Sequence, residues 1–316
     1  MKNGRVAKGL GNGPNDRSRF TILHSFPSPD IEKAWRDCLS RVEFPAHYDT
    51  PEYFAEPYWT GRRPFAILAM DQGSVVGVLT GLHEQNEVMC GLQSRPQICI
   101  DPTADSSVAL NSLARGLLEE SGSVKLVTVY TWSWMPLDMF EVYGFSRRVL
   151  EGNVVLDLSK NSEALFKQFH ENRRRNIRYA IRQGVEVFQA NTLEDASDFY
   201  DVYLRWRETT RKKIRGEQLP WTVFEQRFTH GENVRFFLAR YSGKVIAGIT
   251  LRFLRAGLLE FANNSSLDAF LYLRPNDLLQ WRAIEWASSE GFGRYSLGGA
   301  HLFLRRFGGT VVPIYR

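Results

Sequence analysis

The sequence has few cysteines and no long apolar run, and each lack argues against a class of protein. The three cysteines, Cys38, Cys90 and Cys99, suit neither a disulfide framework nor a metal site in number or spacing. We therefore expect buried thiols in a reducing cytoplasm. No stretch approaches the roughly 18 apolar residues of a membrane span. Residues 1–19 are basic without an apolar core, which is not a secretory signal and predicts a flexible tail.

Charge is scarce in one half of the chain and abundant in the other. Residues 161–316 carry 24 Lys or Arg against 16 Asp or Glu, a net charge of +8 that leaves −3 for residues 1–160. Two arginine-rich runs, 173–182 and 205–215, hold much of the excess. They are either two solvated helix faces or a surface for a polyanion such as RNA, a nucleotide sugar or a nucleotide cofactor.

Internal similarity at an offset of about 170 residues predicts a duplicated unit. Residues 65–78 resemble residues 237–249, two strands joined by a turn that contains glycine. A helix and strand over 109–130 resemble those over 279–299. The predicted fold class is α/β (α+β), with a mixed central sheet flanked by helices in each unit.

The predicted boundaries follow from this repeat. Residues 1–19 form the tail, residues 20–158 the first domain and residues 159–316 the second. The second domain opens with a helix over Ser162–Gln183, and Gly184 ends it.

The most informative stretch is Pro275–Gly299. Pro275 and Asn276 suit the first turn of a helix, and Gly291 suits its end. A hairpin over 244–263 precedes this helix and a short strand follows it. Since a helix N-terminus attracts anions, the pattern predicts a place for an anionic group at the helix start.

Four stretches carry a family resemblance. They are the helix from Asn172 to Val187, the segment from Glu208 to Lys212, the helix from Arg274 to Ala287, and the tail from Tyr295 to Gly309. Together they resemble the tandem acyltransferase fold of the GNAT superfamily, and within it the Fem family of peptidoglycan bridge-forming aminoacyl transferases and related polysaccharide-biosynthesis acetyltransferases. The resemblance implies acyl transfer with a co-substrate donor and no tightly bound cofactor.

The chain departs from that family at two places. The family's tail has a lysine near the acyl-transfer centre, and here Leu304 stands at that position, followed by Arg305 and Arg306. The long helical arm that some members place around tRNA is also missing, because 202–228 has room for two short helices only. Separately, single-domain members of the GNAT superfamily that use CoA carry a glycine-rich phosphate loop, and the corresponding residues 273–277 lack its glycines.

Three residues are candidates for catalysis. Glu260 is the best-placed carboxylate for a general base, with a salt bridge at the sheet edge as the alternative. His301 is a second candidate base or a hydrogen-bonding loop residue. Arg305, beside the missing lysine, would stabilise an oxyanion or a phosphate.

Further residues are candidates for binding. Asn263 and Asn264 orient a carbonyl or form a turn, and the resemblance places Arg211 and Lys212 at a phosphate. The substrate-binding candidates are Arg211, Lys212, Asn263, Asn264, Asn276, Tyr295 and Arg306. The candidates for RNA or phosphate are Arg173, Arg174, Arg175 and Arg178. No metal site is predicted.

These features favour a cytoplasmic acyltransferase that moves an aminoacyl or other acyl group from an activated donor, aminoacyl-tRNA, to an amine of a cell-envelope precursor or secondary metabolite. An N-acyltransferase that uses acyl-CoA or an acyl-carrier protein is one alternative. A non-catalytic tandem protein that binds a nucleotide or RNA is another.

Overall fold

A computed structural model describes residues 19–56, 61–91, 95–136, 138–210 and 218–316. The chain divides into two compact units, residues 1–153 with 312–316, and residues 154–311. The sequence places the junction a few residues later, near 158, and assigns the last residues to the second domain. No helix in the described ranges combines the length and apolar character that a membrane span requires.

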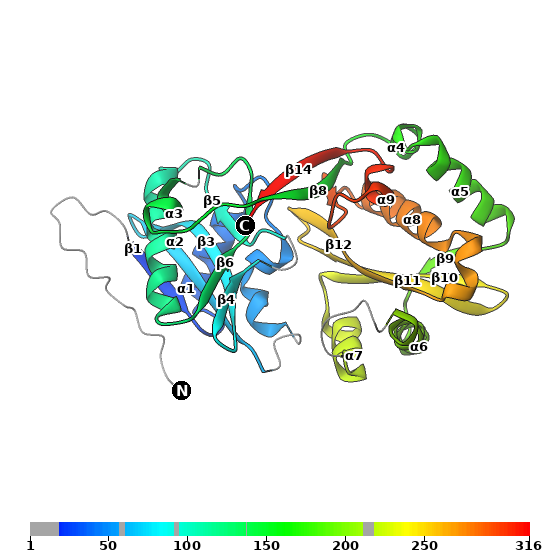
Figure 1. Ribbon diagram of the computed structural model, residues 1–316, viewed down its shortest axis with the longest axis horizontal. Helices are drawn as coiled ribbons and strands as arrows, with labels where there is room; N and C mark the ends of the chain where they lie inside the picture. The colour runs from blue at the N-terminus through cyan, green and yellow to red at the C-terminus, as the bar shows by residue number, and fades with distance from the viewer. Residues whose placement is uncertain (1–18, 57–60, 92–94, 137, 211–217) are drawn as a thin grey trace. The chain divides into compact units, whose positions relative to one another are not determined.

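The first unit is a mixed sheet with a helix on each face (Figure 1). Its strand order is β1-β2-β3-β4-β6, and β5 pairs with β3. The strands and helices, in chain order, are β1 (Arg19–Leu23), α1 (Pro29–Leu39), β2 (Arg63–Asp71), β3 (Ser74–Glu84), β4 (Glu87–Cys90), β5 (Ile98–Ile100), α2 (Ser106–Ser121), β6 (Leu126–Val129), β7 (Thr131–Trp132) and α3 (Asp138–Val142). Short 3₁₀ helices span His47–Asp49 and Pro51–Ala55.

The side chains of β2 alternate between the two faces of the sheet, which explains why a helix covers each face. Phe65 and Ile67 pack with α2, whereas Ala66 and Leu68 pack with Trp35 of α1 on the other face. Successive side chains of a strand point to opposite faces, so one apolar strand covers two cores.

The second unit repeats this plan. Its strand order, β13-β12-β11-β10-β9, matches that of the first unit read from β6 to β1, and β8 pairs with β13. The elements of this part of the chain are β8 (Val149–Asp157), α4 (Ser162–Gln168), α5 (Glu171–Arg182), β9 (Glu186–Gln189), α6 (Leu193–Thr210), α7 (Trp221–His230), β10 (Val234–Tyr241), β11 (Lys244–Phe253), β12 (Leu258–Ser266), a 3₁₀ helix (Asp268–Leu273), α8 (Pro275–Ser289), β13 (Arg294–Ser296), α9 (Leu302–Arg305) and β14 (Thr310–Tyr315). By residue number, β8 and β14 each belong to both units.

In this unit α8 and α5 cover one face of the sheet, and α6 and α7 cover the other (Figure 1). Phe237 of β10 packs toward α8, and its neighbours Phe236 and Leu238 pack toward α6. The side on which a strand residue points therefore decides which helices surround it.

The helix predicted over Ser162–Gln183 is two helices, α4 and α5. Phe169 interrupts it with an extended backbone conformation, at φ −64° and ψ 142°. Its ring is buried against Trp281 and Phe307, and His170 then caps α5 by accepting the backbone N–H of Asn172. Burial of Phe169 in the core thus outweighs the continuous local helix pattern.

Candidate active site

The candidate active site lies where two parallel strands of the second unit separate. β12 and β13 pair over three residues and their pairing ends at Glu260 and Ser296. Beyond that point β12 continues along β11, with a bulge at Ala262. Residues 261–264 are partly exposed, unlike the buried residues before them. The parallel pairing of the two strands therefore ends beside polar side chains.

Glu260 and Arg252 lie opposite each other on neighbouring strands where this pairing ends. They are register partners on β12 and β11, and both are buried, at 4% and 5% exposure. Arg252 also lies opposite Val234, which packs toward α6, so the pair points to the α6 face. Burial lowers the pKa of the Arg252 guanidinium, and the charge of Glu260 opposes this shift. Glu260 lies on a central strand with Arg252 as its cross-strand neighbour, and not at an edge of the sheet as the salt-bridge alternative assumed.

Other polar groups share the surroundings of Glu260. Ser296 is its parallel register partner and is 1% exposed. Thr250 is buried on β11 opposite Asn263, which is partly exposed. Asn264 follows on β12 with similar exposure. A carboxylate, two hydroxyls and two amides thus lie on adjacent strands and can bind or move a proton.

The segment after β13 carries the other predicted catalytic residues. His301 is exposed, occupies the N-cap of α9 and stacks on Phe303 at 6.2 Å between ring centroids. Arg305 donates from Nε to the carbonyl of Ala300. Arg306 is partly buried, and its carbonyl accepts the backbone N–H of His170.

Leu304, at the family's lysine position, is 2% exposed and packs in the core. That position therefore supplies no charge to a reaction.

The first turn of α8 already holds an anion of the protein itself. Arg173 Nη1 lies 2.5 Å from Asp277 Oδ1, and Asn176 donates to the same oxygen. Burial raises the pKa of Asp277, while Arg173 and the hydrogen bonds oppose the rise. Asn276 Oδ1 accepts a hydrogen bond from Ser266. The side chain of Asn276, a predicted substrate-binding residue, thus already takes part in a hydrogen bond within the protein.

The sequence predicts that Arg173 is part of an RNA surface, and this prediction is wrong. Arg173 is 8% exposed, and its guanidinium lies over the ring of Phe303 at 4.3 Å. With its carboxylate partner Asp277, it joins α5 to α8 and α9. The sequence alone does not distinguish the buried arginine from the others in this run, because only the helix geometry shows which of them points inward.

The remaining arginines of α5 do line a hollow. Its volume is about 370 Å³, and its walls are Glu171, Arg174, Arg175, Arg178 and Arg182. Arg174 donates to the carbonyls at the end of α4, and Arg178 lies over Phe166. Arg182 was outside the predicted set and belongs to the same helix face by its spacing of four residues from Arg178.

Tyr295, a predicted binding residue, does not reach the site. Tyr295 is fully buried, and its hydroxyl donates to Gln280 of α8 at 3.0 Å. Burial raises its pKa, as expected for a core tyrosine. Arg211 and Lys212 lie outside the described residues. Arg252 was not among the predicted residues, although it is the one charged residue within the mostly apolar stretch 245–253, which was a usable signal.

Comparison with known proteins agrees with this geometry. Residues 169–305 match the family model described as an acetyltransferase (GNAT) domain. A UDP-N-acetylmuramoylpentapeptide-lysine N(6)-alanyltransferase of Weissella viridescens is 27% identical over 150 residues, which cover 46% of the chain and 43% of the relative. The chain thus matches less than half the length of this curated relative.

Solved structures resemble nearly the whole chain. FemX has a TM-score of 0.68 at 13% identity and covers 93% of the chain and 96% of its own. L-PGS from Bacillus licheniformis has a TM-score of 0.60 at 11% identity, and the match covers 93% of the chain and 92% of that structure. A tandem GNAT protein from the clavulanic acid biosynthesis pathway has a TM-score of 0.58 at 13% identity, and the match covers 95% of the chain and 98% of that structure. At these identities the likeness shows the fold, and it confirms the predicted class of two tandem GNAT-like units. With the family match and the relative, it also confirms the predicted resemblance to GNAT and Fem transferases.

Proposed function

We propose that this chain, whose residues 169–305 are an acetyltransferase (GNAT) domain within a tandem fold like that of FemX, is an acyltransferase that moves an aminoacyl group from charged tRNA to an amine of a cell-envelope precursor. The observation that carries the proposal is the point, inside the matched domain, where the parallel pairing of β12 and β13 ends at buried Glu260 and Ser296. We place the reaction in the cytoplasm, where charged tRNA is found.

In the proposed reaction the acceptor amine attacks the ester carbonyl of the aminoacyl-tRNA. A C–N bond forms, the C–O bond to the terminal ribose breaks, and the ribose oxygen leaves with a proton. Glu260 is the candidate acceptor of the amine proton, directly or through one water, while Arg252 holds its carboxylate in place. Asn263, partly exposed on the same strand, is the candidate donor to the developing oxyanion.

The helix N-termini favour an aminoacyl-tRNA donor over acyl-CoA. A pyrophosphate is usually bound by free backbone N–H groups at a helix start. In the second unit the buried carboxylate of Asp277 occupies the first turn of α8. In the first unit Asp105 Oδ1 caps α2 by accepting from the backbone of Ser107 and Val108, at 2.9 and 3.3 Å. An incoming pyrophosphate would meet a negative charge at either position.

The arginine hollow on α5 supplies the proposed contact to tRNA. Arg174, Arg178 and Arg182 recur every four residues, a rise of about 6 Å, which suits successive phosphates along one strand. In the part of the chain that the structure describes, their guanidinium groups take part in no ion pair. A polyanion can therefore reach them without displacing a carboxylate partner.

The acceptor class follows from the relative. Its name states transfer to a lysine side-chain amine of a UDP-linked muropeptide, so we propose an amine of that precursor class for this chain.

The test is a transfer assay with radiolabelled alanyl-tRNA or seryl-tRNA, and in parallel with acetyl-CoA, each with UDP-N-acetylmuramoyl pentapeptide as acceptor. The proposal expects label on the muropeptide amine with charged tRNA only. Transfer with acetyl-CoA but not with charged tRNA would show that the donor is an acyl-CoA. Binding of tRNA without turnover from any donor would support the non-catalytic alternative.

A variant links the activity to the site. Glu260→Gln should lower the rate of transfer by about 10² or more while tRNA affinity persists. Exposed Glu186→Gln on β9 is the matched control and should leave the rate unchanged. Circular dichroism then tests whether the E260Q variant, whose buried Arg252 loses a charged neighbour, is still folded.

A further inference from the structure

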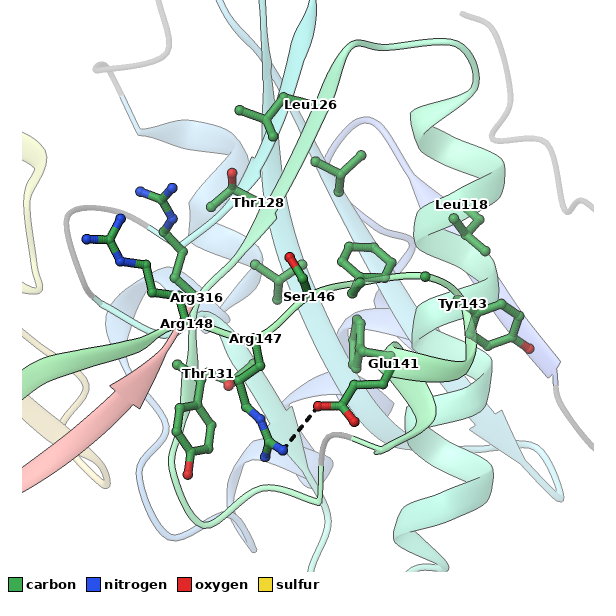
Figure 2. Close-up of a pocket in the computed structure, with 16 residues that line it drawn as sticks. Leu118, Leu126, Thr128, Thr131, Glu141, Tyr143, Ser146, Arg147, Arg148 and Arg316 are labelled. Carbon is green, nitrogen blue, oxygen red and sulfur yellow. Dashed lines mark ion pairs between the residues drawn. The ribbon is translucent and has the colours of Figure 1, made fainter.

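A cavity of about 470 Å³ lies wholly within the first unit, apart from the candidate active site. It follows the outer edge of β6, the last strand in that sheet. The chain after α3 and the C-terminal residues close its other sides (Figure 2). This volume is typical of a pocket for a small organic ligand.

One side of the cavity is apolar. Leu118 of α2 and Leu126 of β6 are 40% and 47% exposed, which is high for leucine, and both line the cavity. Phe140, Phe145 and Val127 also line the cavity. Since exposed apolar side chains that gather at a hollow usually mark a binding surface, this wall fits a hydrocarbon group.

The other side is cationic. Arg148 and Arg316 exchange two backbone hydrogen bonds, at 2.8 and 2.9 Å, so their side chains leave the pair on one face. Figure 2 shows both guanidinium groups extending to the same side. Among the described residues neither has a carboxylate partner, whereas Arg147 pairs with Glu141 at 3.1 Å and lies over Tyr315. Among its side chains the lining therefore has three guanidinium groups against one carboxylate.

Hydroxyl groups lie between these two sides. Ser146 and Thr128 both line the cavity, and Figure 2 shows Ser146 near its centre. A polar head group at the arginines could accept hydrogen bonds from them. The order of the lining, from leucines through hydroxyls to arginines, is that of an amphiphile with a charged end.

We propose that this cavity binds an anionic amphiphile, a molecule with a hydrocarbon chain of moderate length and a phosphate or carboxylate at one end. The chain lies against Leu118 and Leu126, and the anion lies at Arg148 and Arg316. This site is separate from the proposed acyl transfer, and its occupancy requires neither donor nor acceptor.

Binding is measured with the full chain by methyl NMR of its leucine and valine residues, using four probes below their micelle concentrations. Octyl phosphate and octanoate carry both features, 1-octanol lacks the charge, and inorganic phosphate lacks the chain. The proposal expects shifts at Leu118, Leu126 and Val127 with the two anionic amphiphiles. Octyl phosphate should bind about tenfold tighter than octanol or more, and inorganic phosphate should not saturate. The ratio of octyl phosphate to octanoate affinity then identifies the head group.

Paired variants separate the two features. Arg148→Gln should weaken octyl phosphate by about tenfold and leave octanol unchanged, while Arg63→Gln, an exposed arginine away from the cavity, changes neither. Leu118→Glu should abolish binding, whereas Val142→Glu, 75% exposed and outside the lining, should not. Equal affinity for octanol and octyl phosphate, or shifts confined to other methyl groups, would overturn the proposal.

Discussion

Arg173 and Asp277 form a buried ion pair that decides how the first turn of α8 is used. The guanidinium also stacks on Phe303, so three elements of the second unit meet at one side chain. Because the pair is buried, its partners depend on each other more than a surface pair would. This dependence can be measured.

Asp277→Ala should lower the free energy of unfolding by about 3–5 kcal/mol, because it leaves the Arg173 guanidinium buried without a carboxylate. Urea unfolding followed by circular dichroism measures the loss. The double variant Arg173→Met with Asp277→Leu should recover most of it, since apolar groups of similar volume remove both charges. A double variant as unstable as D277A would show that shape rather than charge compensation matters here.

Asp101 gives the first unit an acid-sensitive contact. Its burial opposes ionisation, but hydrogen bonds from Thr103 and the ion pair with Arg41 at 2.6 Å outweigh this and lower its pKa. A folded-state pKa below the unfolded value of about 3.9 stabilises the protein above that pH, and the contribution is lost as pH falls through the folded value.

Asp101→Asn should therefore be less stable than the wild type at pH 6, by about 1 kcal/mol since Arg41 is partly exposed. The difference should shrink steadily below pH 4. Urea titrations from pH 2.5 to 6.5 measure it, with exposed Asp30→Asn as control. A difference that stays constant with pH would contradict the assignment.

Among the elements, those with local signals were predicted well. Pro275 begins α8 as expected, Gly291 takes the left-handed conformation after it at φ +81°, and the hairpin strands match. The break at Phe169 and the burial of Tyr295 were missed, because both depend on residues far away in the chain. The bulge at Ala262 and the partner of Glu260 likewise follow from strand register, which the sequence pattern leaves open.

The contact between α6 and β11 depends on Gly248. A β-carbon there would lie 2.5 Å from Phe199 Cε2 of α6 and 2.8 Å from Leu238 Cδ2. Gly248→Ala should therefore lower the free energy of unfolding by about 1–3 kcal/mol through overpacking. Gly293→Ala, where no atom lies within 4 Å, is the matched control and should change little. Thermal unfolding of both variants measures the effect, and equal midpoints would show that α6 can shift at no cost.

For the whole molecule, the repeat at about 170 residues was the strongest sequence signal, and the two sheets share one strand order. The repeat did not reveal that residues 312–316 belong to the first unit, where Ile314 pairs with Trp132. The sequence of a short apolar segment does not show which strand it pairs with. The charge difference between the halves was also visible, and it leads to a test of the proposed RNA surface.

The net charge of +8 over residues 161–316 should make tRNA binding strongly dependent on salt, since each phosphate contact releases counterions. Arg178→Gln and Arg182→Gln, both in the hollow on α5, should each reduce the slope of log K against log salt by about 1. Arg255→Gln, whose guanidinium already pairs with Glu290, should leave the slope unchanged. Fluorescence anisotropy with labelled tRNA from 50 to 300 mM salt measures these slopes. Equal slopes for all three variants would place the RNA elsewhere on the second unit, because a surface that makes no phosphate contact releases no counterion.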